Sequence, residues 1–190
     1  MSGIPAAVFL DRDGTIIEDV HYIKSPEQVR TIPGAPTAIG RLNRAGIAVI
    51  VVTNQSGIAR GLLTADDYEA VRAHLDALLA DAGAHIDESY YCPHHPDVTG
   101  PCDCRKPATK LFEDAMRHFA LQPDEVAYIG DRWRDVAPAR ALGGRGILIP
   151  SAMTTASDLQ KAAADSAQIA PTLGTAVEML LGLTSPVATR

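Results

Sequence analysis

The chain has 190 residues, of which 46% are hydrophobic and 21% charged, with a net charge of −6 and a pI of about 5.4. This composition is ordinary for one globular domain, and the negative charge argues against a general nucleic-acid-binding surface. No apolar run reaches the roughly 18 residues of a membrane span, and the N-terminus lacks the features of a signal peptide. We therefore expect a single domain over residues 1–190, cytoplasmic and monomeric, with no membrane or nucleic-acid partner.

Strands and helices are predicted to alternate along the chain. Residues 47–52 give the clearest strand, because they are apolar throughout, as in a parallel strand covered by helices on both faces. In chain order, the predicted elements are strand 6–10, helix 36–45, strand 47–52, helix 64–82, strand 86–91, helix 109–119, strand 126–129, helix 135–142, strand 146–149, and helices 158–165 and 174–181. The pattern predicts an α/β fold with a doubly wound, Rossmann-like parallel sheet.

Polar motifs directly follow several of the predicted strands. Asp11-Arg-Asp-Gly-Thr15 follows the first strand, Thr53-Asn-Gln-Ser-Gly57 the second, and Gly130-Asp-Arg-Trp-Arg-Asp135 the fourth. Lys106 stands after a cysteine-rich segment, at the entrance to a helix. Ligands bind outside the carboxyl ends of the strands in such sheets, so we expect these side chains to share one site.

The aspartates at positions 11 and 13 suit phosphoryl transfer. A carboxylate attacks phosphorus when a cation removes the charge repulsion, and Mg²⁺ prefers oxygen ligands such as these and the distant Asp131. Lys106 and the Thr53 hydroxyl can then hold the phosphoryl oxygens, while one aspartate of the pair moves the proton. An isolated aspartate after a strand is more often a turn former or helix cap, but chance rarely places all these partners in order at strand ends.

Four segments together resemble the haloacid dehalogenase (HAD) phosphatase superfamily, and within it the branch of histidinol-phosphate and heptose-bisphosphate phosphatases. They are Phe9–Thr15, Val52–Gly61, Cys104–Pro107 and Gly130–Asp135, and the resemblance spans residues 5 to 150. It implies a HAD-like fold and hydrolysis of a phosphomonoester through an aspartyl-phosphate intermediate.

The resemblance also implies a role for each matching residue. Asp11 would be the nucleophile and Asp13 the general acid/base, and Thr53 and Lys106 would bind the transferring phosphoryl group. Mg²⁺ would be held by the Asp11 side chain, the Asp13 backbone carbonyl and Asp131. Asp135 would lie behind these ligands or reach the metal through water.

All three cysteines lie in one proline-rich segment, residues 92–107. Cys92, His94, Cys102 and Cys104 supply a Cys₃His set for tetrahedral zinc, and four protein ligands leave no position for an activated water. We therefore predict a structural Zn²⁺ that clips the loop 92–104. His95 is the competing imidazole, but alternation along the chain and the resemblance both favour His94. An odd cysteine count does not make a disulfide framework, which fits reduced thiols in the cytosol.

Two other classes of function deserve comparison with the enzyme. A zinc knuckle that binds nucleic acid is disfavoured by the acidic net charge and by the low aromatic content of 5%. A phosphoacceptor signalling domain also uses a strand-end aspartate with Thr and Lys. Asp13 argues against this class. As a general base beside the acyl phosphate, it would shorten the lifetime of the phosphorylated form.

No large cap domain fits between the motifs, so nearby loops must recognise a small phosphorylated substrate. Candidate substrate-binding residues are Asn54, Arg60 and Arg105, with Arg132 as a further cation. Within the family that the chain resembles, the 7-phosphate of D-glycero-D-manno-heptose 1,7-bisphosphate is the favoured target, because a second phosphate gives the arginines a partner. Histidinol phosphate is the alternative substrate.

Overall fold

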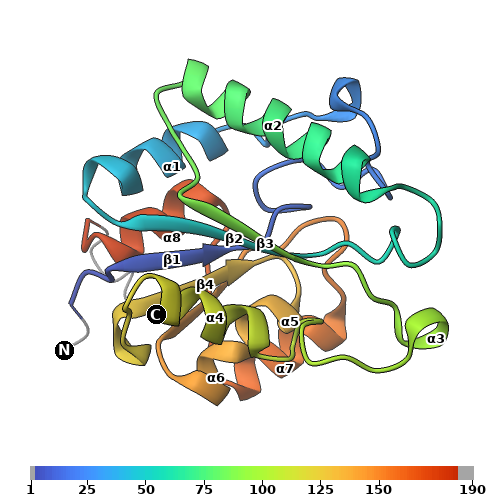
Figure 1. The fold of residues 1–190 in the computed structure, drawn as a ribbon. Coiled ribbons are helices and arrows are strands. Elements are labelled where there is room, and N and C mark those ends of the chain that lie inside the picture. Colours follow the sequence, from blue (N-terminus) through green and yellow to red (C-terminus); the bar gives the residue numbers. More distant parts are fainter. Residues whose placement is uncertain (1–2, 184–190) are drawn as a thin grey trace.

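The computed structural model describes residues 3–183 (Figure 1). A six-stranded sheet runs in the order β3-β2-β1-β4-β5-β6, and every neighbouring pair of strands is parallel. The strands are β1 (Ala7–Leu10), β2 (Ala48–Asn54), β3 (Glu88–Cys92), β4 (Val126–Gly130), β5 (Arg145–Leu148) and β6 (Gln168–Ile169). This confirms the predicted α/β class and parallel sheet, and no large cap domain is present in the described part of the chain.

Helices cover both faces of the sheet (Figure 1). One face carries α1 (Ala35–Arg44), α2 (Ala65–Asp81) and α8 (Leu173–Leu180). The other carries α4 (Lys110–His118), α5 (Trp133–Val136), α6 (Pro138–Leu142) and α7 (Ala156–Ala164). The short elements are α3 (Pro96–Thr99) and two 3₁₀ turns, Pro26–Gln28 and Pro123–Glu125. None of the helices in the described part is long and apolar enough to cross a membrane.

The alternation of side chains along β1 explains why two cores form. Val8 and Leu10 are buried with the α1, α2 and α8 side of the sheet. Phe9 faces the opposite side, where its ring lies 5.2 Å from the rings of both Phe112 and Tyr128. Because β1 is buried on both faces, it can be the central strand that fixes the site at its end.

The strand order places a topological switch beside β1. The chain passes from β1 to β2 and β3 on one side, then returns to β4 and continues to β5 and β6 on the other. The loops after β1 and β4 therefore diverge to opposite sides, and a crevice opens between them at the carboxyl ends of the strands. Asp11 and Asp131 begin these two loops.

The structure adds detail that the sequence patterns did not predict. The expected helix 135–142 is divided into α5 and α6 at Pro138, which has no N–H to donate. Helix α7 begins before the expected residue 158, because the Thr155 side chain caps it by accepting from Asp158 N–H. The two-residue strand β6 and the single-turn helix α3 were not predicted, being too short for a periodic pattern.

Candidate active site

The turn after β1 brings a second strand end against the Asp11 loop. Gly14 has a φ of +83°, and a Cβ there would lie 2.5 Å from an oxygen of Asp131. Only glycine combines this left-handed conformation with so close an approach. The Asp131 carboxylate therefore lies directly beside the backbone that carries Asp13. Two ligands of one metal ion must be close together in this way.

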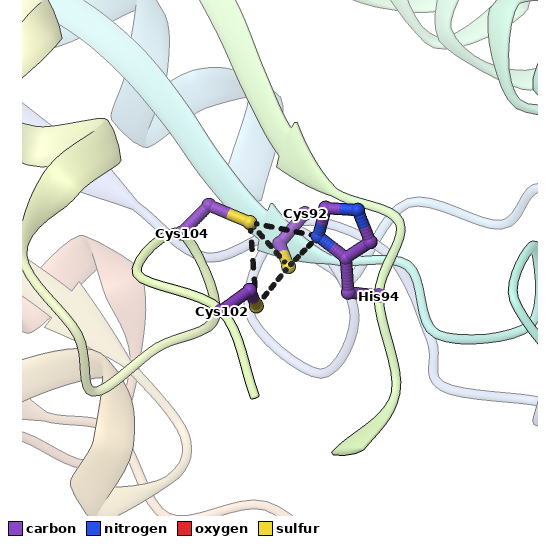
Figure 2. Close-up of side chains that lie close together, drawn as sticks. All are labelled: Cys92, His94, Cys102 and Cys104. Atoms are coloured by element: carbon purple, nitrogen blue, oxygen red, sulfur yellow. Dashed lines mark hydrogen bonds between the residues drawn. The ribbon is translucent and has the colours of Figure 1, made fainter. Parts of the chain in front are cut away.

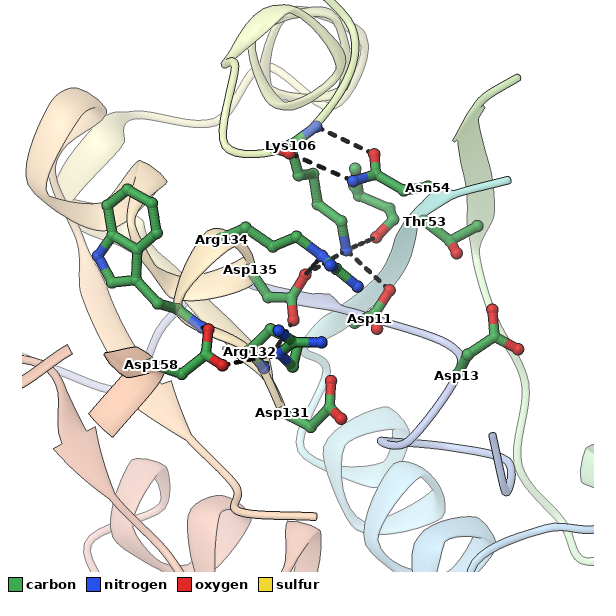
Figure 3. Close-up of polar contacts among 12 residues, drawn as sticks. Asp11, Asp13, Thr53, Asn54, Lys106, Asp131, Arg132, Arg134, Asp135 and Asp158 are labelled. Carbon is green, nitrogen blue, oxygen red and sulfur yellow. Dashed lines mark hydrogen bonds and ion pairs between the residues drawn. The ribbon is translucent and has the colours of Figure 1, made fainter. Parts of the chain in front are cut away.

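Lys106 is a buried cation that contacts Asp11 directly (Figure 3). Its Nζ lies 2.7 Å from Oδ1 of Asp11 and 2.7 Å from Oδ1 of Asp135, and it donates to the Val52 carbonyl at 2.6 Å. Burial alone would lower the pKa of Lys106, but the carboxylates of Asp11 and Asp135 outweigh burial and raise it. The ammonium group is thus kept charged at the end of β1.

Three buried carboxylates gather around this lysine. Oxygens of Asp11, Asp131 and Asp135 lie within 4.8 Å of one another. Burial and the charge of Asp11 raise the pKa of Asp131 to about 7, although a hydrogen bond from Ser151 Oγ at 2.5 Å works in the opposite direction. The cluster carries more negative charge than its surroundings neutralise, which is the condition that a divalent cation relieves.

Arginines border a cleft of about 400 Å³ above the carboxylates. Arg105, Arg132 and Arg134 line it together with Asp13, Thr53 and Asn54, and with the loop over residues 19–23. Arg132 is held by Asp158, whose Oδ2 accepts from its Nε at 2.8 Å. In contrast, the buried Nε of Arg134 has no hydrogen-bond partner among the described residues.

The cysteine segment forms a second ligand cluster (Figure 2). The sulfur of Cys104 lies 2.9 Å from that of Cys92, 3.5 Å from that of Cys102 and 3.3 Å from Nδ1 of His94. The sulfurs of Cys92 and Cys102 are 3.7 Å apart, and all three cysteines are free thiols. Tetrahedral zinc with bonds of about 2.3 Å would place its sulfur ligands about 3.8 Å apart, so these four groups need only small shifts to hold it.

His95 is turned away from this cluster. Its Nε2 lies 2.6 Å from the guanidinium of Arg60, and its ring approaches α3 at Asp97. His94 is therefore the imidazole that the fold places among the thiols. Arg60 is exposed and is directed to His95 on the cysteine loop, and it does not line the cleft that it was expected to serve.

The cysteine loop is tied to the cleft at several points. Arg105 donates to the His94 carbonyl at 3.3 Å. The amide of Asn54 contacts the backbone of Lys106 twice, donating to its carbonyl at 3.2 Å and accepting from its N–H at 3.0 Å. Asn54 thus anchors the loop that presents Lys106, and its contact with the Lys106 carbonyl uses one of its two amide hydrogens while Asn54 also lines the cleft.

Comparison with known proteins identifies the family. The chain is 39% identical over 167 residues to the D-glycero-beta-D-manno-heptose-1,7-bisphosphate 7-phosphatase of Photorhabdus laumondii, covering 85% of this chain and 88% of the relative. The enzyme of that name from Pseudomonas putida is 41% identical over 143 residues, covering 75% of this chain and 81% of the relative. The chain belongs to the HAD-like phosphatases of this branch.

Two further comparisons agree with the membership. Residues 103–176 match the HAD-hydrolase-like family. The crystal structure of D,D-heptose 1,7-bisphosphate phosphatase from B. bronchiseptica, complexed with magnesium and phosphate, superimposes with a TM-score of 0.82. It is 31% identical, and the match covers 94% of this chain and 99% of the other.

As in the HAD-like pattern, the fold gathers Asp11, Asp13, Thr53, Lys106 and Asp131 at the carboxyl ends of neighbouring strands, and brings Asp135 beside them. Sequence reasoning missed several residues that contact the groups of this site, among them Arg134, Ser151 and Gln55. Arg134 lies in the same motif as Asp131, where Arg132 was chosen instead. Ser151 follows β5, and the rule that ligands gather after strands would have found it had it been applied to that strand.

Proposed function

We propose that this HAD-like chain is a phosphomonoesterase that removes the 7-phosphate of D-glycero-D-manno-heptose 1,7-bisphosphate. The observation that carries the proposal is the contact between Lys106 and Asp11 at the end of β1, in a chain whose relatives are named for that reaction. A lysine in this position neutralises a carboxylate that must approach a phosphate dianion, which is the main electrostatic obstacle to the attack.

The chemistry that we assign uses the chain's own groups in two steps. An oxygen of Asp11 attacks phosphorus and the bond to the sugar oxygen breaks, while Asp13 donates a proton to that oxygen. Asp13 then takes a proton from the water that attacks the aspartyl phosphate, which releases inorganic phosphate and restores Asp11. Lys106 and Thr53 hold the phosphoryl oxygens through both steps, where charge accumulates in the transition state.

Mg²⁺ is the metal that the carboxylate cluster suits. Its donors are hard oxygens, all from buried side chains, and burial together with the charge of Asp11 raises the pKa of Asp131 to about 7, which a bound cation would offset. Asp11 and Asp131, with the Asp13 carbonyl, would hold the ion, and it would supply the charge that offsets phosphate and carboxylate. Asp135 is engaged by Lys106 and by the N–H of Arg132 at 2.9 Å, which suits a supporting position.

Zn²⁺ is the metal that we assign to Cys92, His94, Cys102 and Cys104. The donor set is soft and fills a tetrahedron, so the ion would have no position for water and would act structurally. Its place in the chain is informative, because Arg105 and Lys106 follow the last ligand directly. We infer that zinc holds these two residues at the cleft.

The arginines of the cleft support a substrate with a second phosphate. Arg105, Arg132 and Arg134 all line it; Arg132 precedes α5 and Arg134 lies in its first turn. A bisphosphate gives these cations a partner that histidinol phosphate, with its amine and imidazole, does not.

The test is phosphate release from both anomers of the heptose 1,7-bisphosphate and from histidinol phosphate, compared by kcat/KM. We expect a heptose bisphosphate to be preferred, and the product to retain its 1-phosphate by phosphorus NMR. A higher kcat/KM for histidinol phosphate, or loss of the 1-phosphate, would overturn the assignment. The same assay with each anomer decides which one the cleft accepts.

A further inference from the structure

The side chain of Gln55 bridges two residues to which the proposed function gives different roles. Its Nε2 lies 2.9 Å from Oδ2 of Asp13 and 2.8 Å from Oγ1 of Thr53, and the residue is buried. Arg12 donates to both oxygens of Asp13, so this carboxyl group acts as an acceptor here and the amide nitrogen of Gln55 faces it. This contact therefore fixes which way round the amide lies.

The orientation of the amide determines what Thr53 can do. The same nitrogen faces the Thr53 hydroxyl, so Thr53 accepts the second amide hydrogen of Gln55. A hydroxyl has one hydrogen and two acceptor positions, and this contact uses one of the acceptor positions. The hydroxyl hydrogen remains available for a phosphoryl oxygen in the cleft that Thr53 lines.

Asp13 is held from its other side by Arg12. Nη2 of Arg12 lies 3.0 Å from both oxygens of Asp13, and its Nε lies 3.2 Å from Oδ1. The Arg12 side chain is buried, with its guanidinium over the ring of Tyr68 at 5.4 Å. In Figure 3, Asp13 points away from Asp11 and Lys106, so its orientation is set by these donors and not by the carboxylate cluster.

We propose that Gln55 is a positioning residue that links the phosphate-binding hydroxyl of Thr53 to the general acid/base Asp13. One amide hydrogen sets the direction in which Thr53 donates, and the other holds Asp13 at the edge of the cleft where the leaving oxygen departs. Arg12 completes the grip on Asp13. This inference rests on the proposed function, because it takes the roles of Thr53 and Asp13 from it.

A purely structural role for Gln55 has to be distinguished from this one. Its backbone N–H donates to the Cys92 carbonyl at 2.7 Å and its carbonyl accepts from Ile58 N–H at 3.1 Å, so its main chain already closes the turn after β2. These bonds survive a change of side chain. A variant that keeps the length of the side chain and loses its donors therefore tests the amide alone.

The experiment compares Gln55→Met and Gln55→Glu with wild type on two leaving groups. An alkyl phosphate needs a proton on its departing oxygen, whereas p-nitrophenyl phosphate leaves as a stable anion and does not. We expect kcat/KM to fall about 100-fold for the alkyl ester and about 10-fold for the aryl ester, since general acid catalysis contributes about 10²–10⁴-fold. The inhibition constant of orthophosphate should rise several-fold, because Thr53 is no longer oriented.

The controls separate the possible failures. Gln168→Met makes the same substitution on exposed β6 and should leave both substrates and the inhibition constant unchanged. Equal losses on both esters with an unchanged orthophosphate constant would overturn the inference, as would full activity in Gln55→Met.

If Gln55→Met fails to fold, Gln55→Glu carries the test, because it keeps the shape and places an acceptor against Asp13. Wild type inactive on every phosphomonoester would instead overturn the proposed function.

Discussion

Two clusters of ligand-type side chains lie on either side of Arg105 and Lys106, and they differ in kind. The cluster at the strand ends consists of three carboxylates, with a basic cleft above it and a lysine among them. The cysteine cluster consists of three thiols and one imidazole, the number and kind of donors that would fill the tetrahedral shell of the proposed zinc. One site can accept a substrate and the other is closed, so the number of ligands as well as their chemistry separates a reacting centre from a structural one.

The largest effect is expected from Asp11→Asn, which removes the nucleophile that we propose. Turnover should fall by at least about 10⁴-fold, as when a nucleophile is removed from other enzymes that form covalent intermediates. The protein should stay folded, because one of three crowded negative charges is lost and Lys106 keeps Asp135 as a partner. Steady-state phosphate release and a thermal melt measure the two quantities.

The control for this variant is Asp97→Asn on α3, whose side chain is 85% exposed. It should retain wild-type turnover. Residual activity of Asp11→Asn above one hundredth of wild type would contradict the assignment of the nucleophile, and a low melting temperature would make the loss structural.

Cys104→Ser addresses the closed cluster and should alter both zinc and phosphate binding. The purified variant should lose most of its zinc, and its Tm should fall by about 4–8 °C if the clip contributes about 2 kcal/mol. Orthophosphate should also bind more weakly, because Arg105 and Lys106 follow directly in the chain. Metal analysis, a thermal melt and inhibition by orthophosphate report the three effects.

The two neighbouring histidines provide a matched pair for this prediction. His94→Ala should lose zinc, whereas His95→Ala should keep it, because the His95 ring contacts Arg60 and not the thiols. Zinc retained by His94→Ala would contradict the assignment of His94 as a ligand. Unchanged phosphate binding in zinc-free Cys104→Ser would show that the cysteine cluster does not position Arg105 and Lys106.

The sequence predicted the residues of the two clusters better than the side chains around them, and the reason is physical. The thiols lie close together in the chain and Lys106 directly follows them, while Asp11 and Asp131 each follow an apolar run, so spacing and strand ends were sufficient to predict them. The side-chain positions of Arg60 and Arg134 were not predicted correctly, because no periodic sequence pattern specifies the direction that a long side chain takes. Arg60 turns to His95 and Arg134 enters the cleft. Ser151 follows β5 and donates to Asp131 at the end of the neighbouring strand β4, so the rule that ligands gather after strands covers it as well.

Arg134→Met tests whether the open site relies on Arg134, whose Nε lies 3.8 Å from Oδ1 of Asp135. The pKa of Arg134 would be lowered by burial, but Asp135, Asp11 and Asp131 raise it, so the variant loses a full positive charge. Orthophosphate inhibition should weaken by at least about 10-fold, in line with the roughly 1.5–3 kcal/mol of a hydrogen bond to a charged group. Arg140→Met, which removes the partner of Asp165 away from the cleft, is the control and should leave the inhibition constant unchanged. Unchanged inhibition in Arg134→Met would exclude a contact with phosphate.

The smallest effect is a dependence of Mg²⁺ affinity on pH that the thiol cluster should not share. Burial and the charge of Asp11 raise the pKa of Asp131 to about 7, so below that pH the metal must displace a proton. The affinity should therefore fall by up to about 10-fold per pH unit below 7 and level off above it. In the absence of metal, stability should depend on pH in the opposite sense. The pKa of Asp131 is higher in the folded state than in the unfolded chain, so between these two values the folded state binds more protons. The free energy of unfolding should therefore decrease as the pH rises from 4 to about 7.

Two variants sharpen this last prediction. Ser151→Ala removes the hydrogen bond that opposes the rise in the pKa of Asp131, so the midpoint of the Mg²⁺ profile should move to higher pH. Asp131→Asn has no proton to displace, so its weaker affinity should lose the dependence near pH 7. Titration calorimetry with MgCl₂ at several pH values measures both. A midpoint that stays in place in Ser151→Ala would mean that another group governs the profile, since this bond acts on Asp131 directly.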